Sequence, residues 1–263
     1  MHRRRLLSLC GAGLVGLAGC AGETPGGGTD TPTPTADTAV AVERARALPW
    51  LVALNTPDSI AVGGDDDERY VLVTVNATDA DEPPAREAFT LSVGEETHTP
   101  TTDLGFGGSL DSYHFLGPSV YDAERPSGDL PFAVPERESA PTVALTWPGF
   151  DDERSLEGAG EVLARHDPSF EVESFGAESD DAGEATLSAT VHNTGDARGW
   201  FVGALNRTGP STAYTPVTGT AFEVGAGETE TWTHVDDSVG SSGTATYRFR
   251  TASERRQASV EVG

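Results

Sequence analysis

The stretch ATLSATVHNTGD, residues 185–196, decides the fold of this chain. Its first seven residues alternate, so that Ala, Leu, Ala and Val stand at every second position between Thr and Ser. Such period-two alternation is typical of a strand with one face in a core and the other in water. The stretch then ends in Asn193-Thr194-Gly195-Asp196, which are turn-forming residues. It therefore predicts an antiparallel strand followed by a turn.

The rest of residues 169–263 repeats this pattern. Short runs of β-branched and aromatic residues are separated by Gly, Asp and Pro, as in small β-sandwiches. We therefore expect residues 169–263 to form a β-sandwich. Besides residues 185–191, the predicted strands are 170–175, 200–205, 222–224, 230–233, 245–249 and 258–262.

Residues 38–150 carry similar signals and are expected to form a first β-sandwich. Pro131 and Pro135 have no N–H to donate to a neighbouring strand, which predicts an edge position for the strand that contains them. The predicted strands are 70–75, 89–93, 97–99, 113–116, 130–134 and 143–147.

Residues 151–168 are expected to link the two sandwiches, either as a short helix or as an irregular connector. Ser155 is the candidate helix cap. Domains usually part where few contacts cross, so we expect residues 169–263 to fold alone. The apolar residues that would share one face of this helix are Leu156, Ala159, Val162 and Leu163.

Longer segments resemble known surface domains. YVLVTVNATDADEP (residues 70–83), FTLSVGEETHTP (89–100) and LPFAVPE (130–136) resemble immunoglobulin-like domains of prokaryotic surface lipoproteins. TLSATVHNTGDARGWF (186–201) and GTATYRFRTA (243–252) are similar to cell-adhesion-related sandwich domains of archaea and bacteria. The resemblance implies an all-β chain with two immunoglobulin-like β-sandwich domains, an architecture that hosts many functions.

The first nineteen residues read as a signal peptide. Arg3-Arg4-Arg5 precede an apolar run at residues 6–18, which is shorter than the ~20 residues that a membrane-spanning helix needs. LAGC, residues 17–20, resembles the lipobox of prokaryotic lipoproteins. The resemblance implies cleavage before Cys20 and a lipid anchor on its thiol.

RRRLL, residues 3–7, resembles a twin-arginine export motif, which implies that Arg3 and Arg4 form the export signal. An ordinary secretory signal has the same basic start, so both routes stay open. Residues 20–37 are rich in Thr, Pro and Gly and are expected to be a disordered, lipidated stalk. We therefore expect the protein on the outer face of the cell membrane, with the lipid on Cys20 as its membrane contact.

The charge balance is strongly acidic. Asp and Glu number 42 against 17 basic residues, all of them Arg, for a net charge of −25. Residues 1–19 hold three arginines and no acidic residue, so their removal takes the net charge to −28. This charge excludes general binding to nucleic acid or to an anionic membrane surface. Acid excess without lysine resembles the proteins of halophilic archaea, in which concentrated salt screens self-repulsion.

The chain offers little for catalysis or metal binding. Beyond residue 19 its only thiol is Cys20, so no disulfide or thiolate metal site is expected. His192 and His234 fall on strands of one predicted domain and could meet there as a metal pair, but separate surface or core histidines are favoured, so no metal ligand is predicted. The loop carboxylates at residues 65–68 and 79–82 are candidate calcium ligands, against a solvated acidic surface. We predict no catalytic residues and no cofactor.

Asn76-Ala77-Thr78 and Asn206-Arg207-Thr208 are sequons, which makes Asn76 and Asn206 candidate N-glycosylation sites. The four tryptophans are expected in the cores, with a carbohydrate platform as the alternative. They are Trp50, Trp147, Trp200 and Trp232.

These features predict a non-enzymatic, lipid-anchored surface protein of a halophile. Its two sandwiches would serve binding, adhesion or assembly of an envelope complex with a partner that the sequence does not identify. The alternative is a solute- or metal-binding lipoprotein that serves a membrane transporter. An enzyme whose catalytic residues are distant in sequence is the third class. A pocket with converging, buried polar side chains between the domains would favour the second or third class.

Overall fold

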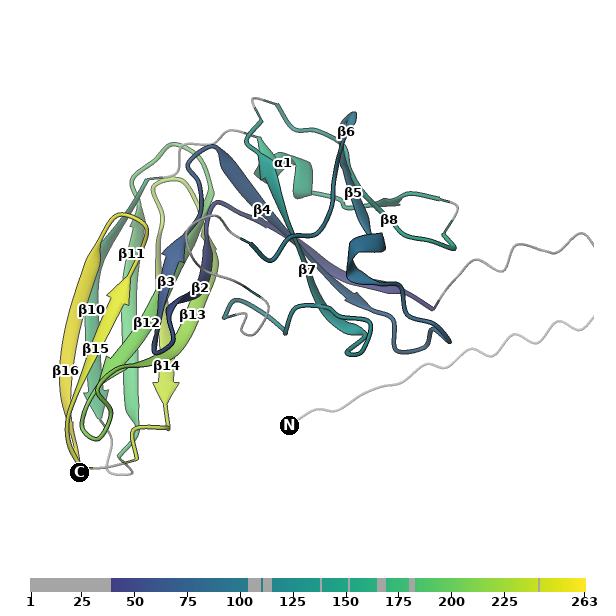
Figure 1. Ribbon diagram of the computed structural model, residues 1–263. Helices are drawn as coiled ribbons and strands as arrows, with labels where there is room; N and C mark the ends of the chain where they lie inside the picture. Colours follow the sequence, from purple (N-terminus) through teal and green to yellow (C-terminus); the bar gives the residue numbers. More distant parts are fainter. Residues whose placement is uncertain are drawn as a thin grey trace, which may run out of the picture. The chain divides into compact units, whose positions relative to one another are not determined.

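The computed structural model describes residues 39–103, 110, 115–137, 139–150, 152–164, 169–179, 183–240 and 242–263. The described part is all-β, apart from a single α-helical turn and a single 3-10 turn (Figure 1). Every pairing between its numbered strands is antiparallel, and only isolated bridges such as Val120 to Asp129 are parallel. None of the described helices is both long and apolar enough to cross a membrane.

The C-terminal region, residues 169–263, contains all seven predicted strands, each of them longer than predicted. They form two sheets, with strand orders β10-β11-β14 and β13-β12-β15-β16. The strands are β10 (Phe170–Ser179), β11 (Ala185–Asn193), β12 (Gly199–Thr208), β13 (Thr215–Val224), β14 (Thr229–Asp236), β15 (Gly243–Arg250) and β16 (Arg255–Val262).

One apolar core lies between these two sheets. In β11, Ala185, Leu187, Ala189 and Val191 are buried and the residues between them are more exposed, as the alternation predicts. Aromatic rings from both sheets fill the centre, with the Phe249 ring centroid 5.3 Å from that of Phe175 and 5.6 Å from that of Trp232. The region is therefore sandwich-like. We call this group of residues the C-terminal core.

The N-terminal region, residues 39–164, is built from smaller sheets. Their strand orders are β1-β4-β7, β2-β3 and β6-β5-β8-β9. The elements are β1 (Ala41–Leu48), β2 (Leu51–Thr56), β3 (Ser59–Gly63), β4 (Glu68–Asn76), a 3-10 turn (Arg86–Ala88), β5 (Thr90–Val93), β6 (Glu96–His98), β7 (Ser127–Pro135), β8 (Val143–Thr146) and β9 (Arg154–Ser155).

Five of the six strands predicted here are present as β4, β5, β6, β7 and β8. The sixth, 113–116, is not confirmed, because residues 115–116 are in a turn and residues 113–114 lie outside the described residues. The edge position of β7 is confirmed, since within its sheet this strand pairs only with β4. β1, β2 and β3 were not predicted as individual strands.

The segment between the regions packs against the N-terminal one. It contains helix α1 (Ala159–Leu163), one of the two alternatives that the sequence left open. Ser155 does not cap this helix, because Ser155 lies in β9 and the helix starts after Gly158, whose φ is 78°. Leu156, Ala159 and Leu163 are buried in the same cluster as the β4 valines and Trp147, which we call the N-terminal core. For Val162 the side chain lies outside the described part of the chain.

A third group of apolar residues joins the regions, which belong to one compact unit. It contains Tyr70 and Leu72 of β4 together with Val202 and Ala204 of β12, and the β2-β3 hairpin packs against β12 (Figure 1). We call it the shared cluster. Its buried residues are Leu48, Leu51, Val52, Ala53, Ile60, Tyr70, Leu72, Leu110, Leu116, Val120, Val202 and Ala204.

A buried pair of hydrogen bonds crosses the same contact. The Asn206 side chain accepts a bond of 2.8 Å from the Ile60 N–H and donates one of 2.9 Å to the Ile60 carbonyl. Asn206 is fully buried, so these bonds satisfy backbone groups that water does not reach. The β2-β3 hairpin is thereby held in register on β12.

Candidate functional site

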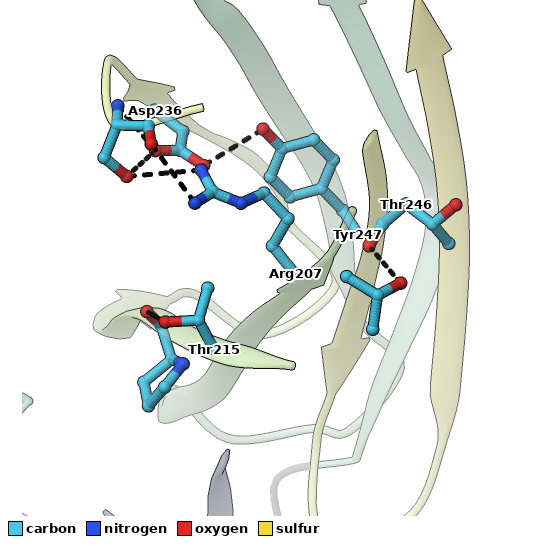
Figure 2. Close-up of polar contacts among 8 residues, drawn as sticks. Arg207, Thr215, Asp236, Thr246 and Tyr247 are labelled. Carbon is cyan, nitrogen blue, oxygen red and sulfur yellow. Dashed lines mark hydrogen bonds and ion pairs between the residues drawn. The ribbon is translucent and has the colours of Figure 1, made fainter. Parts of the chain in front are cut away.

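A buried polar group lies at one end of the C-terminal core (Figure 2). Arg207 of β12 and Asp236 at the end of β14 form an ion pair of 2.5 Å between Nη1 and Oδ2, and their side chains are 6% and 2% exposed. The Tyr247 hydroxyl of β15 donates to the same carboxylate oxygen at 3.0 Å. Ser238 donates to the other oxygen from its hydroxyl at 2.6 Å and from its N–H at 3.0 Å.

The neighbours of Asp236 determine its charge state. Burial raises the pKa of this carboxyl, but hydrogen bonds from Ser238, the charge of Arg207 and the Tyr247 hydroxyl outweigh burial and hold the pKa below its ordinary value. Burial, followed by the Asp236 charge, raises the pKa of Tyr247 well above its usual range. Asp236 is thus ionised and Tyr247 neutral at pH 7. The donors named above are directed at protein acceptors, and in this group only the buried Arg207 Nε has no hydrogen-bond partner among the described residues. The group stabilises the fold rather than presenting chemistry to a ligand.

A more open site lies beside the contact between the two regions. It is a hollow of about 420 Å³, within the size range of small-molecule sites. Trp50 precedes β2, Arg69 belongs to β4 and Trp200 to β12, and the turn between β15 and β16 supplies hydroxyl groups. Its lining residues are Pro49, Trp50, Asp66, Arg69, Ser169, Phe170, Trp200, Phe201, Val202, Thr251, Ala252 and Ser253.

The polar walls of this hollow are fixed by contacts within the protein. Arg69 donates to Glu136 and, at 2.9 Å, to the Glu68 carbonyl. In the turn, the Thr251 hydroxyl accepts from the N–H groups of Ser253 at 3.2 Å and Glu254 at 3.0 Å. The hollow therefore has a pre-organised lining of aromatic rings and hydroxyl groups, which suits binding of a polar ligand.

A second hollow of about 240 Å³ shares Thr251, Ala252 and Ser253 with the first. Arg250 and Arg255 line it, at opposite positions in the antiparallel β15-β16 pair. Val62 of β3 and Glu254 of the turn also line it. The β15-β16 turn thus separates an aromatic hollow from one that carries two guanidinium groups.

The two histidines considered as a metal pair do not come together. His234 lies opposite Leu187 on the core side of the sheet and stacks on Trp232, with ring centroids 5.8 Å apart. His192 is on the other face, where its Nδ1 is 3.0 Å from the Thr229 hydroxyl. Within the described residues, no three His, Cys, Asp or Glu side chains are grouped as a metal would require. This includes the carboxylates at residues 65–68 and 79–82.

The two sequons lie in different environments. Asn76 is half-buried, and its side-chain oxygen accepts from the Thr78 N–H at 3.1 Å and hydroxyl at 2.7 Å. Asn206 is buried and both ends of its amide are bonded to Ile60. The sequence interpretation of Asn206 as a glycan acceptor therefore fails for the folded chain, because the acceptor nitrogen is enclosed. Asn76 stays a candidate.

The tryptophans divide between the two roles considered for them. Trp147 is 5% exposed in the N-terminal core, and Trp232 packs against the C-terminal core. Trp50 and Trp200 are half-buried: each contacts the shared cluster and lines the larger hollow. Sequence reasoning missed this site, because residues about 150 positions apart carry no local signal of their proximity. Arg3, Arg4 and Cys20 lie outside the described residues.

The comparisons with known proteins are distant. No protein family matches the chain, and no curated protein matches it. Among solved structures, the GH3 β-glucosidase of Bifidobacterium adolescentis has a TM-score of 0.32 and 17% identity over 36% of this chain and 17% of its own length. β-Glucosidase 3B of Thermotoga neapolitana has a TM-score of 0.31 and 15% identity over 36% of this chain and 16% of its own.

Proposed function

We propose that the chain is a non-enzymatic, lipid-anchored protein on the outer face of the cell membrane of a halophile. It presents two immunoglobulin-like β-sandwich domains for binding, adhesion or assembly of an envelope complex. A lipid on Cys20 anchors it, and residues 20–37 form the stalk.

The strand order of the C-terminal region supports an immunoglobulin-like domain. If its seven strands are lettered A to G along the chain, they pair as A-B-E and D-C-F-G. Immunoglobulin domains keep a tyrosine in strand F whose hydroxyl bonds to a group upstream, at the corner between strands E and F. Tyr247 occupies strand F here, and its hydroxyl bonds to Asp236, at the end of strand E. The buried polar group therefore acts as a corner clamp.

The observation that carries a binding role is the hollow between Trp50 and Trp200. Two aromatic side chains with unburied surface border a pre-organised polar wall, and Arg69, the cation on that wall, is held by Glu136. Such a lining holds a ligand through ring faces and hydroxyl groups. The same hollow favours the second candidate, a solute-binding lipoprotein that serves a transporter. Transfer of the bound ligand to a membrane transporter would distinguish this candidate from an adhesion or assembly protein.

The anchor is tested by Cys20→Ser in the native host. We expect the variant protein to appear in the medium or as an unprocessed precursor, with Ser8→Ala as a signal-peptide control that is processed and anchored. Membrane fractionation with mass spectrometry of the N-terminus measures both. A Cys20→Ser protein that is processed and membrane-bound like the wild type would contradict the proposal.

The halophilic origin is tested by removing salt. At molar salt the Debye length is about 3 Å, whereas at millimolar salt repulsion among the excess carboxylates is no longer screened. We expect the β circular dichroism of the purified protein to be lost on dialysis to millimolar salt and kept at molar salt. An unchanged spectrum and melting temperature at low salt would contradict a halophilic origin.

A further inference from the structure

We propose that the two adjoining hollows bind a saccharide that carries a carboxylate. The rings of Trp50 and Trp200 stack on the sugar in the larger hollow, and Arg250 and Arg255 pair with the carboxylate in the smaller one. The inference rests on the proposed function in treating the protein as a binding protein, and it names the class of ligand.

The tryptophans have the features of a stacking platform. Each packs part of its ring against the shared cluster, which fixes its orientation, and each retains exposed surface at the hollow. Neither indole N–H has a hydrogen-bond partner among the described residues, so both remain free to donate to a ligand hydroxyl. Trp147, by contrast, is 5% exposed within its core.

The arginines of the smaller hollow differ from most others in this acidic chain. Arg69, Arg137 and Arg207 each form an ion pair with a carboxylate. The side chains of Arg250 and Arg255 have no hydrogen bond or ion pair within the described residues, and the Arg250 Nε is buried without a partner.

The placement of these two arginines also favours an anionic ligand. They stand directly opposite each other in the β15-β16 pair, where like charges repel. Guanidinium groups offer several donors in a planar fork that fits a carboxylate. Two adjacent unpaired arginines in a chain with 42 acidic residues are therefore explained by a carboxylate that arrives with a ligand.

The β15-β16 turn connects the two parts of the site and is rigid. The Thr251 N–H donates to the Glu254 carbonyl at 3.0 Å, and the Glu254 carboxylate accepts from the Val172 N–H of β10 at 2.7 Å. Thr251 and Ser253 thus stay in place between the tryptophans and the arginines. A ligand that crosses the turn meets an aromatic surface, then hydroxyl groups, then positive charge.

A saccharide suits this sequence of surfaces better than other anions. Sugar rings present C–H faces to aromatic rings, and their hydroxyl groups both donate and accept, as do those of Ser and Thr. A small anion would use only the arginines and would leave the ring faces of Trp50 and Trp200 without a contact. The larger hollow alone, at about 420 Å³, has room for a sugar ring.

The test uses the purified mature protein in detergent and molar salt, with calorimetry and tryptophan fluorescence as readouts. The probes are a β-1,4-linked diglucuronic acid, the neutral disaccharide cellobiose, sodium acetate and tetraglutamate. We expect the diglucuronic acid to bind at least about tenfold more tightly than cellobiose, because only its carboxylate forms charge-assisted hydrogen bonds with the arginines. Acetate and tetraglutamate should not quench the tryptophans.

Two variants separate the contributions of the two hollows. Arg250→Gln should remove the preference for diglucuronic acid and leave cellobiose binding unchanged, whereas Trp200→Leu should weaken both sugars at least about tenfold. Leucine preserves apolar contact with the shared cluster, and circular dichroism verifies the fold. Arg44→Gln is the matched charge control, because Arg44 is exposed on β1 and lines neither hollow.

The proposal is overturned if neither sugar binds, if Arg250→Gln retains the preference, or if tetraglutamate competes as well as the diglucuronic acid. The last result would indicate an acidic peptide as the ligand. Because binding is measured on purified protein, a failure of the Cys20 anchor leaves this result unaffected, and a failure of sugar binding leaves the anchor experiment unaffected.

Discussion

In the C-terminal region, buried and more exposed residues alternate along strands such as β11, whereas the N-terminal region depends on a strand that is buried on both faces. In β11 buried and more exposed residues alternate along the whole strand. In β4 every residue from Tyr70 to Val75 is buried. Val71 and Val73 point into the N-terminal core, and Leu72 points into the shared cluster. A continuous apolar run in this chain therefore marks a strand between two cores.

The same rule explains β12, which breaks the alternation of its own region. Residues 201–207 are all buried, because Phe201 and Leu205 belong to the C-terminal core while Val202 and Ala204 belong to the shared cluster. β4 and β12 thus play equivalent roles in the two regions. The difference between these strands and β11 shows where the regions meet.

Disrupting the corner clamp should produce the largest effect within one region. Asp236→Ala leaves Arg207 buried without its partner, which costs about 3–5 kcal/mol of unfolding free energy. Glu96→Gln, at the exposed Arg137–Glu96 pair of the N-terminal region, is the control and should change stability little. Guanidinium chloride denaturation at molar salt measures both. A loss below about 1 kcal/mol for Asp236→Ala would contradict the assigned role.

The contact between the regions is tested by Asn206→Ala. The variant leaves the buried N–H and carbonyl of Ile60 unpaired, for a loss of about 2–4 kcal/mol. Asn193→Ala is the matched control, because this buried side chain bonds to Ala197 and Val224 within the C-terminal region. Both should lower the denaturation midpoint, but only Asn206→Ala should separate the unfolding of the two regions. Equal behaviour of the two variants would argue against a specific coupling.

Each region also contains a histidine that makes stability depend on pH. Burial lowers the pKa of His98 and of His234, and for both it outweighs nearby carboxylates that raise the pKa. The unfolded chain therefore binds protons more readily than the folded one. Stability should be complete above pH ~6.5 and fall as the pH drops through that value toward the folded pKa.

Substitution separates the two contributions. His234→Phe and His98→Phe should each flatten part of the decline in denaturation midpoint between pH 7.5 and 5, with the wild-type protein as reference. If both variants retain the full wild-type decline, these histidines are not its source.

The sequence predicted the strands of the C-terminal region well because their alternation is a local property. It did not predict β1, in which Arg44 and Arg46 interrupt the apolar pattern and a bulge shifts the register after Val42. Arg46 is accommodated by donating to the Leu116 carbonyl at 2.8 Å, a contact between segments 70 positions apart.

The candidate site shows the same limit. Trp50, Trp200 and Arg250 belong to three separate strands or strand ends, and only the packing of β2 and β3 on β12 brings them to adjoining hollows. From the sequence, Trp50 and Trp200 were two of four tryptophans that could serve either in a core or in a carbohydrate platform, and nothing distinguished them from the other two. The unpaired state of Arg250 depends on which carboxylates the fold brings near it, and no sequence pattern encodes that.

Separate folding of residues 169–263 stays a prediction of the sequence. The shared cluster affects the stability of such a fragment, because part of the cluster belongs to the N-terminal region. A fragment of residues 165–263 retains the C-terminal core but exposes Val202 and Ala204 to water. We expect such a fragment to be less stable than the same residues in the whole chain. The two regions would then unfold together in the intact protein.

The most direct measurement compares unfolding at one tryptophan in each region. Trp147 reports on the N-terminal core and Trp232 on the C-terminal one, and replacing the other three tryptophans by Phe gives two single-tryptophan proteins. Each protein is unfolded in guanidinium chloride at molar salt. We expect the fluorescence transition of each protein to have the same midpoint as its own circular dichroism transition. If the fluorescence midpoint of Trp147 or of Trp232 differs clearly from the circular dichroism midpoint of the same protein, the shared cluster does not couple the two regions.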